Sequence, residues 1–122
     1  MTADSFVILY VEDDELVRES FADSLVTTER RIVAVGDIAS ARAALRENNV
    51  NLLITDLNLG DDSGHDLARE ALRENPKLPV IICSGHDAAE IVRSLGPTAH
   101  ALRKPIDVGE LEALIERIAR GS

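Results

Sequence analysis

Asp56 is the residue in this sequence that most needs a chemical explanation. The apolar run 52–54 leads to it, and a polar loop that contains Gly60 follows. A short apolar run bounded by turn residues is typical of a buried parallel strand, and open α/β sheets carry their chemistry at the carboxyl ends of such strands. Because a carboxylate beside an apolar core costs several kcal/mol unless something compensates it, Asp56 is the candidate reactive residue and needs partners.

Four other polar residues stand where they can be those partners. Glu12 and Asp13 follow the first apolar run of the chain. Ser84 ends the fourth run, and Lys104 comes just after the fifth. Because the carboxyl ends of all strands in a parallel sheet lie at one edge, we expect these side chains to share a crevice with Asp56.

Three carboxylates in one crevice repel each other. With partial screening, each close pair costs on the order of 4 kcal/mol, and either protonation of one acid or a bound cation relieves it. Carboxylate oxygens at a solvated rim suit Mg²⁺ or Mn²⁺, whereas the scattered histidines and the single cysteine offer no zinc set. A divalent ion beside an aspartate, with a lysine and a hydroxyl opposite, is suited to phosphoryl transfer.

The remaining sequence predicts the elements that position these residues. Apolar runs that alternate with amphipathic segments indicate an α/β fold, a parallel sheet covered by helices on both faces. We expect strands at 6–11, 32–35, 52–56, 79–84 and 99–102. We expect helices after residue 15, at 39–47, at 64–74, from 87 to 95 and after 107.

Several acids have an alternative role as helix caps. Asp87 and Glu90 have the spacing of a capping box, and the same spacing recurs before the last helix. Glu12 and Asp13 can cap the first helix whether or not they bind a metal, with Asp14 a solvated acid of the first turn.

Length, composition and charge limit the class of protein. A chain of 122 residues with 45% hydrophobic and 2% aromatic residues predicts one domain with an aliphatic core. The net charge of −9 argues against nucleic acid or an anionic membrane as partner. The single Cys83 can form no internal disulfide and is expected in the core. With no leader and no apolar run of membrane length, the sequence predicts a soluble, cytoplasmic protein.

Four motifs occur in order at specific spacings: VEDDE after the first strand, ITDLNL around Asp56, VIICSG around Ser84, and LRKP at Lys104. Taken singly, Ser84 is more often a turn residue and Lys104 a surface residue. Together the motifs resemble the response-regulator receiver domain of two-component signalling, from about residue 6 to residue 120. The resemblance implies a doubly wound, five-stranded parallel sheet of order 2-1-3-4-5, flavodoxin-like with five helices. It also implies that residues 1–122 form one receiver domain without an output domain.

The resemblance also implies a metal site. Asp13 would bind Mg²⁺ directly and Glu12 through water, with Asp56 and the backbone carbonyl of Asn58 as further ligands. Mn²⁺ is the alternative ion.

The remaining roles concern the phosphoryl group. Asp56 would be the phosphoacceptor, Ser84 would hydrogen-bond the phosphoryl oxygens, and Lys104 would pair with Asp56 or its phosphate. A cis peptide bond would precede Pro105. The family usually has an aromatic residue where this chain has Ala101, and that ring turns inward as the hydroxyl residue moves. Since alanine has no side-chain torsion to switch, we expect a weak response on the face formed by the fourth helix, the fifth strand and the fifth helix.

By resemblance, the chain is a phosphorylation-dependent switch. It would take its phosphoryl group from a sensor histidine kinase or a histidine phosphotransfer protein, catalysing its own modification, and would then change its binding to an output partner that the sequence does not name. The apolar stripe of the last helix indicates a core face first and a weak homodimer surface second.

Three alternatives stay open. A Mg²⁺-dependent phosphohydrolase of the haloacid dehalogenase type also uses a strand-end aspartate, but its second acid is replaced here by Asn58. A flavodoxin-like flavin binder is disfavoured by the few aromatics and by acids where a phosphate loop would lie. A pseudo-receiver is disfavoured by the intact set of acids.

Overall fold

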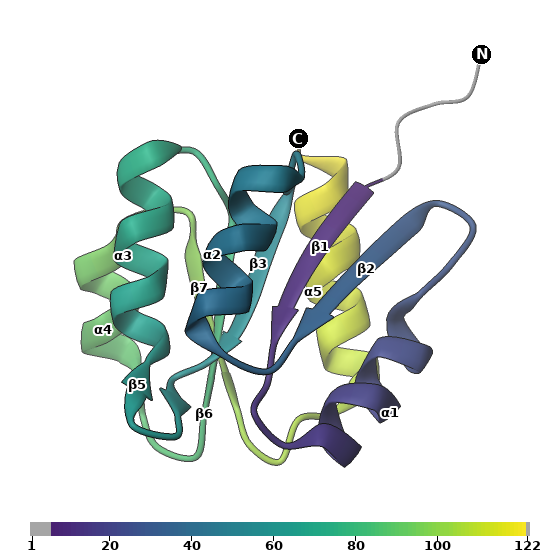
Figure 1. Ribbon diagram of the computed structural model, residues 1–122, viewed down its shortest axis with the longest axis horizontal. Helices are drawn as coiled ribbons and strands as arrows, with labels where there is room; N and C mark the ends of the chain where they lie inside the picture. Colours follow the sequence, from purple (N-terminus) through teal and green to yellow (C-terminus); the bar gives the residue numbers. More distant parts are fainter. Residues whose placement is uncertain (1–5, 122) are drawn as a thin grey trace.

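The computed structural model describes residues 6–121, in which strands and helices alternate along the chain (Figure 1). The strands are β1 (Phe6–Val11), β2 (Arg30–Val35), β3 (Leu52–Asp56), β4 (Asn58–Leu59), β5 (Asp62–Ser63), β6 (Val80–Ser84) and β7 (Ala99–Arg103). The helices are α1 (Glu15–Leu25), α2 (Ile38–Glu47), α3 (Gly64–Glu74), α4 (Ala89–Leu95) and α5 (Val108–Arg120). No helix within 6–121 is both long enough and apolar enough to cross a membrane.

Five of the strands form one parallel sheet in the order β2-β1-β3-β6-β7. This is the predicted order 2-1-3-4-5, because β4 and β5 form a separate hairpin of two-residue strands in the loop after Asp56. Gly60 adopts a positive φ of 64° in the turn of that hairpin, a conformation that glycine enters without steric cost. The predicted fold class is confirmed.

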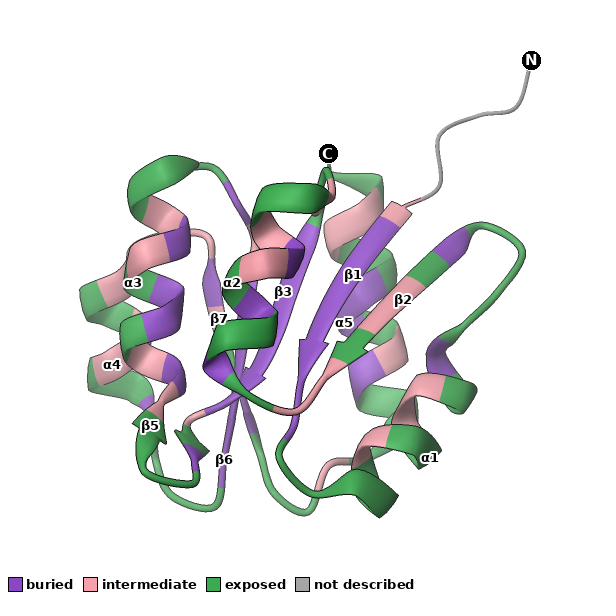
Figure 2. Ribbon diagram, in the orientation of Figure 1, coloured by how far each residue is buried: buried purple, intermediate pink, exposed green. Residues whose placement is uncertain are grey.

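Helices cover both faces of the sheet, with α2, α3 and α4 on one face and α1 and α5 on the other (Figure 1). Alternate residues of each strand point to opposite faces, so that Leu9 and Leu53 pack towards α2 and α3, whereas Ile8 and Ile54 pack towards α5. The central strands are buried along nearly their whole length (Figure 2). The core is aliphatic, as the composition predicts, and the buried Cys83 is part of it.

Strand β2 begins at Arg30, two residues earlier than predicted. The prediction followed a run of apolar residues and therefore left out this charged residue. The Arg30 side chain is only 6% exposed. It forms ion pairs with Glu112 and Glu116 of α5 and donates to the backbone oxygen of Leu25. Because these partners lie far away in sequence, no local pattern could predict that this charge joins a strand.

Two helices begin at a different residue from the predicted cap. Helix α1 is capped by Asp14, whose Oδ1 accepts the N–H of Val17, and not by Glu12 or Asp13. Helix α4 has Ala88 at its N-cap. Asp87 Oδ1 still accepts the N–H of Ala89 at 3.0 Å, but the reciprocal bond from Glu90 that would complete the predicted capping box is not formed among residues 6–121. The same spacing does work before α5, where Asp107 accepts the N–H groups of residues 109 and 110.

Candidate functional site

Three carboxylates meet at the carboxyl edge of the sheet, as the strand order requires. One oxygen from each of Glu12, Asp13 and Asp56 lies within 4.8 Å of the other two. Glu12 and Asp13 follow β1, and Asp56 ends the neighbouring β3. Glu12 and Asp56 are buried, at 3% and 4% exposure, while Asp13 is exposed. The cluster therefore has a buried floor and one acid at its solvated mouth.

Lys104 lies on the same edge of the sheet and binds Asp56. Its Nζ is 2.9 Å from Asp56 Oδ1 and 3.9 Å from Glu12 Oε1. Burial lowers the pKa of Lys104, but the hydrogen bond and the charge of Asp56 outweigh burial and raise it. The Lys104–Pro105 peptide bond is cis, as the resemblance implied. The ammonium group therefore stays charged beside Asp56.

The second oxygen of Asp56, Oδ2, is buried and has no hydrogen-bond partner among the described residues. A buried carboxylate oxygen without a partner is costly, and this one lies in a cluster of acids. Mg²⁺ is typically held by one or two carboxylates, with water and phosphate oxygens completing its coordination. The donor set of this chain fits that ion.

Crowding of the acids shifts the protonation of Glu12. Burial and the neighbouring carboxylate of Asp56 raise its pKa to about 7, against the lowering effect of the Asp14 N–H, which donates to Glu12 Oε2 at 3.0 Å. Burial is the larger cause of the rise, and the charge of Asp56 adds the repulsion expected from the sequence. A bound cation would relieve the repulsion among the acids without protonation of Glu12.

The structure places the other two predicted residues beside the cluster without joining them to it. Ser84 ends β6 and is buried; its Oγ accepts the N–H of His86 at 3.0 Å, and no hydrogen bond joins it to Asp56 within residues 6–121. Asn58 lies in β4, two residues after Asp56 and opposite Ser63. Both lie on the correct edge of the sheet, and their predicted roles remain predictions.

Two residues that support the site were missed in the sequence. Arg18 donates from Nη1 to the backbone oxygen of Glu12 at 2.8 Å and so fixes the loop that carries the acids. At Gly64 an added Cβ would lie 1.9 Å from the backbone oxygen of Asp56, so only glycine fits there. The position of Gly64 at a helix start was a weak signal for this contact, whereas nothing local to Arg18 indicated its partner.

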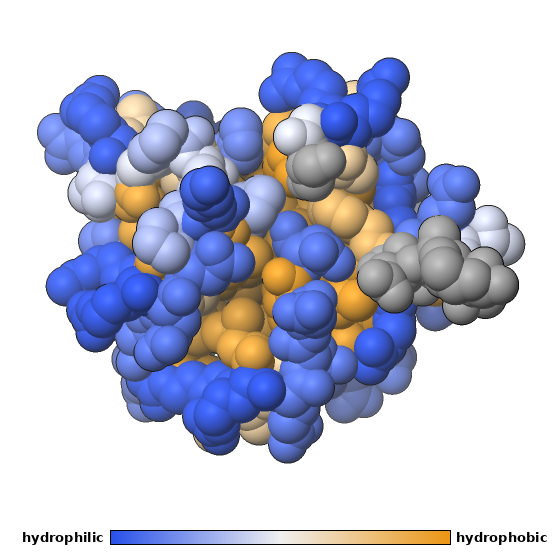
Figure 3. All heavy atoms as spheres, turned by 90° about the horizontal axis from the view of Figure 1, so that it is seen from above, coloured by the Kyte–Doolittle hydropathy of each residue, from blue (hydrophilic) through white to orange (hydrophobic). Residues whose placement is uncertain are grey.

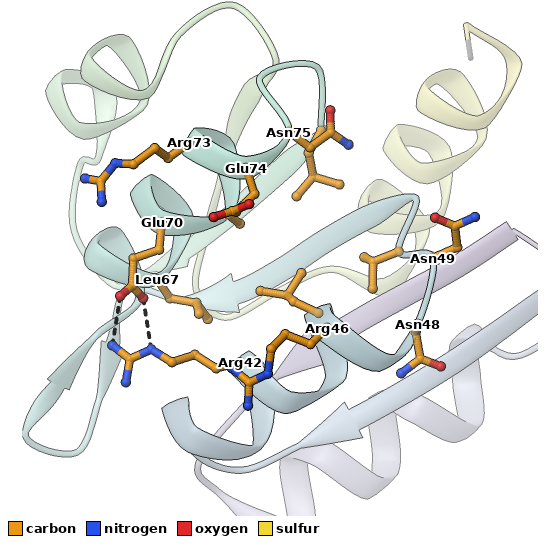
Figure 4. A pocket seen from close by; sticks show the side chains of 13 residues that line it. Arg42, Arg46, Asn48, Asn49, Leu67, Glu70, Arg73, Glu74 and Asn75 are labelled. Atoms are coloured by element: carbon orange, nitrogen blue, oxygen red, sulfur yellow. Dashed lines mark hydrogen bonds and ion pairs between the residues drawn. The ribbon is translucent and has the colours of Figure 1, made fainter.

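Hollows on the surface do not by themselves identify the site. One of about 430 Å³ lies beside the acids and reaches between α1 and the start of α5, where it is lined by Val17, Phe21 and Leu111. A larger one of about 590 Å³ lies between α2 and α3, where Arg42 binds both carboxylate oxygens of Glu70 (Figure 4). This larger hollow lies at the edge of the sheet where the strands begin. Seen from that end, the molecule has an apolar centre surrounded by hydrophilic side chains (Figure 3).

Comparisons with known proteins agree with this geometry. Residues 8–116 match the response regulator receiver domain family. The chain is 33% identical over 117 residues to the probable transcriptional regulatory protein TcrX of Mycobacterium tuberculosis, covering 90% of this chain and 50% of TcrX. It is 30% identical over 116 residues to the response regulator protein FleR of Pseudomonas aeruginosa, covering 93% of this chain and 24% of FleR. It therefore spans half or less of the length of these two relatives.

Solved structures show the same fold. The non-phosphorylated HemR receiver domain of Leptospira biflexa is 30% identical, with a TM-score of 0.82, and the match covers 93% of this chain and 94% of that one. A CheY-like receiver domain protein of Methanospirillum hungatei has a TM-score of 0.84 at 21% identity, over 96% of each chain. The chain belongs to the response regulator receiver domains, the phosphorylation-dependent switches of two-component signalling.

Proposed function

We propose that Asp56 is the phosphoacceptor of this switch and that Glu12, Asp13 and Asp56 hold Mg²⁺ beside it, with the backbone carbonyl of Asn58. The observation that carries the proposal is the state of the Asp56 carboxylate. Lys104 binds one of its oxygens at 2.9 Å, while the other is buried in a cluster of acids and has no hydrogen-bond partner within residues 6–121. Mn²⁺ has the same ligand preferences and is the alternative ion.

The reaction transfers a phosphoryl group from a phosphohistidine. An oxygen of the Asp56 carboxylate bonds to phosphorus as the P–N bond of the donor breaks, and the electron pair of that bond stays on the imidazole nitrogen. Later attack by water breaks the P–O bond, returns the carboxylate and releases inorganic phosphate.

Each of the surrounding side chains has a role in that transfer. Lys104 neutralises charge that develops on the phosphoryl oxygens, and the Ser84 hydroxyl donates a hydrogen bond to one of them. Mg²⁺, when bound, would neutralise the charge of these oxygens and of the acids. Phosphoryl transfer needs such positioning and charge neutralisation more than covalent chemistry from the protein.

Receiver domains interact with histidine kinases and with output domains. For this chain we place the phosphodonor, a histidine kinase or histidine phosphotransfer protein, on the apolar surface at the mouth of the site. Leu16 is 78% exposed at the start of α1, and beside it the partly exposed Val17 lines the hollow that leads to Asp56. Exposed apolar side chains that adjoin a reactive group are expected at such an interface. The cytoplasm, where such kinases present their phosphohistidine, is the proposed location.

Small-molecule phosphodonors test the assignment without a kinase. Incubation with acetyl phosphate or phosphoramidate and Mg²⁺ should add one phosphoryl group, measured by intact mass. EDTA or Asp56→Asn should abolish the gain. Asp61→Asn, which removes an exposed acid of the same loop, is the matched control and should leave the gain unchanged. Undiminished phosphorylation of Asp56→Asn would disprove the assignment.

A further inference from the structure

Arg103 is a long, exposed side chain that reaches from the sheet to the loop between β6 and α4. It is the last residue of β7 and lies opposite Ser84 in the register of the two strands. Its Nε donates to the backbone oxygen of Gly85 at 3.1 Å. The peptide that directly follows Ser84 is therefore held by a charged donor from the neighbouring strand.

Helix α4, to which this loop leads, is short and only partly buried. It has seven residues, none of which is fully buried, although Val92 and Leu95 pack against the core. At its N-terminus, Asp87 Oδ1 accepts the N–H of Ala89 at 3.0 Å. Near its other end, Ser94 Oγ lies 3.3 Å from Nε2 of His65 in α3. Because burial supplies most of the stability of a helix in a folded protein, the position of α4 depends strongly on polar contacts at its two ends.

The face of β7 that carries Arg103 offers no other bulky support. Side chains two apart on a strand share a face, so Ala99 and Ala101 lie on the same side as Arg103. Both are alanines, and Ala101 is exposed. Arg103 is therefore the one long side chain on this face of β7, from residue 99 to residue 103.

Ser84 must move or turn if its hydroxyl is to reach a phosphoryl group on Asp56. Its Oγ accepts the N–H of His86, and its backbone oxygen accepts the N–H of Lys104 at 2.8 Å. The second of these bonds extends the β6–β7 pairing by one residue beyond β7. The bond from Arg103 is made by a flexible side chain at the surface, so it can be released without disturbing the sheet.

We propose that Arg103 is a positioning residue that holds the β6–α4 loop through Gly85 and so opposes the movement of Ser84 towards a phosphorylated Asp56. When Arg103 releases Gly85, the start of α4 is freed. The hydrogen bond between Arg103 and Gly85 thus couples the site to that helix. The inference rests on the proposed function, since it concerns the same Ser84.

The first test uses the variant Arg103→Gln, which is shorter and uncharged, with Arg46→Gln as the matched control. Arg46 is an exposed arginine of α2, near the opposite edge of the sheet. Amide hydrogen exchange across residues 85–95 should be at least about threefold faster in Arg103→Gln than in the wild type or the control, the size expected for one hydrogen bond. Unchanged exchange in this segment would overturn the proposal.

The second test measures the apparent affinity for beryllofluoride with Mg²⁺, a probe that mimics an aspartyl phosphate, by NMR titration. Arg103→Gln should bind about three- to tenfold more tightly, because less free energy is spent in moving the loop. Loss of a positive charge near an anion site would weaken binding, so tighter binding separates release of the loop from electrostatics. A wild type that binds no beryllofluoride would overturn the proposed function itself. A wild type that binds it, with Arg103→Gln no tighter, would overturn the role of Arg103 alone.

Discussion

Asp56 is constrained from three sides at the scale of single residues. Lys104 binds one oxygen of the Asp56 carboxylate, and Gly64 packs against the Asp56 backbone. Glu12 lies beside Asp56, whose charge contributes to the raised pKa of Glu12. The N–H of Gly64 also donates to the backbone oxygen of Leu57 at 2.7 Å, which ties the start of α3 to the acceptor loop. The carboxylate is thus held from its side chain and its main chain alike.

Replacement of Gly64 by alanine should damage both stability and phosphorylation. The added Cβ would lie 1.9 Å from the backbone oxygen of Asp56 and 2.9 Å from Thr55 Oγ1, so the backbone must shift. We expect Gly64→Ala to lower the free energy of unfolding by about 2 kcal/mol or more in urea denaturation. In the control Gly121→Ala the nearest contact is an ordinary 3.5 Å, so little change is expected. Equal effects of the two variants would contradict this reading.

The thiol of Cys83 gives a prediction for alkaline pH. Burial raises its pKa from 9.0 to about 12, and Asp56 adds to the rise. Below pH 9 the thiol is protonated whether the chain is folded or unfolded, so its contribution to stability is complete. Between pH 9 and about 12 it ionises only in the unfolded chain, which favours unfolding, and the contribution is lost by about pH 12.

Two measurements check this prediction. A thiol reagent should modify Cys83 at pH 8 in denaturant and only slowly in the native protein. The free energy of unfolding should fall above pH 9, and it should fall less in Cys83→Ala, although the raised pKa of Tyr10 leaves part of the effect in place. Rapid modification of the native thiol would rule out the burial on which both expectations depend.

At the scale of elements, Arg30 joins β2 to α5 and to the end of α1. Its guanidinium is nearly inaccessible to solvent and binds Glu112, Glu116 and the backbone oxygen of Leu25. Exposed ion pairs contribute little to stability, while loss of a buried hydrogen-bonded charge is costly. The ion pairs of Arg30 and Arg42 therefore differ in their expected contribution to stability.

Arg30→Met should lower the free energy of unfolding by about 2–4 kcal/mol, because the backbone oxygen of Leu25 loses a donor and α5 loses its attachment to β2. Arg42→Met is the matched control. It breaks an ion pair whose side chains are 50% and 42% exposed, and should cost less than about 1 kcal/mol. Urea denaturation of the two variants compares them directly, and a cost for Arg42→Met as large as that for Arg30→Met would refute the distinction.

For the whole molecule, the net charge of −9 and the acid cluster predict stabilisation by divalent cations. At a Mg²⁺ concentration ten times its dissociation constant, binding to the folded chain alone adds about 1.4 kcal/mol of stability. Thermal unfolding should therefore shift upward with MgCl₂, and Asp13→Asn should remove most of the shift. NaCl of equal ionic strength is the control for general screening. An identical shift with NaCl would mean that no site is filled.

Local patterns in the sequence predicted what depends on near neighbours. Apolar runs and helical periodicity located five strands and five helices. They could do so because residues on one buried face recur every two positions in a strand and every three or four in a helix. Four motifs gave the family through their resemblance to receiver domains, and with it the strand order and the cis bond at Pro105. The meeting of Glu12, Asp13, Asp56 and Lys104 followed from the geometry of parallel sheets.

Contacts between distant parts of the chain were decided only by the tertiary structure. Arg30 pairs with residues more than 80 positions away, Arg103 reaches Gly85 across 18, and Gly64 abuts Asp56 across the β4–β5 hairpin. The start of α4 also differed from its capping pattern, since Asp87 bonds only the N–H of Ala89 and the loop before the helix is also held by Arg103 of the neighbouring strand. A sequence pattern indicates which side chains are favoured to be buried or to need a hydrogen-bond partner. The partner itself is fixed only when the packed elements bring two segments within hydrogen-bonding distance.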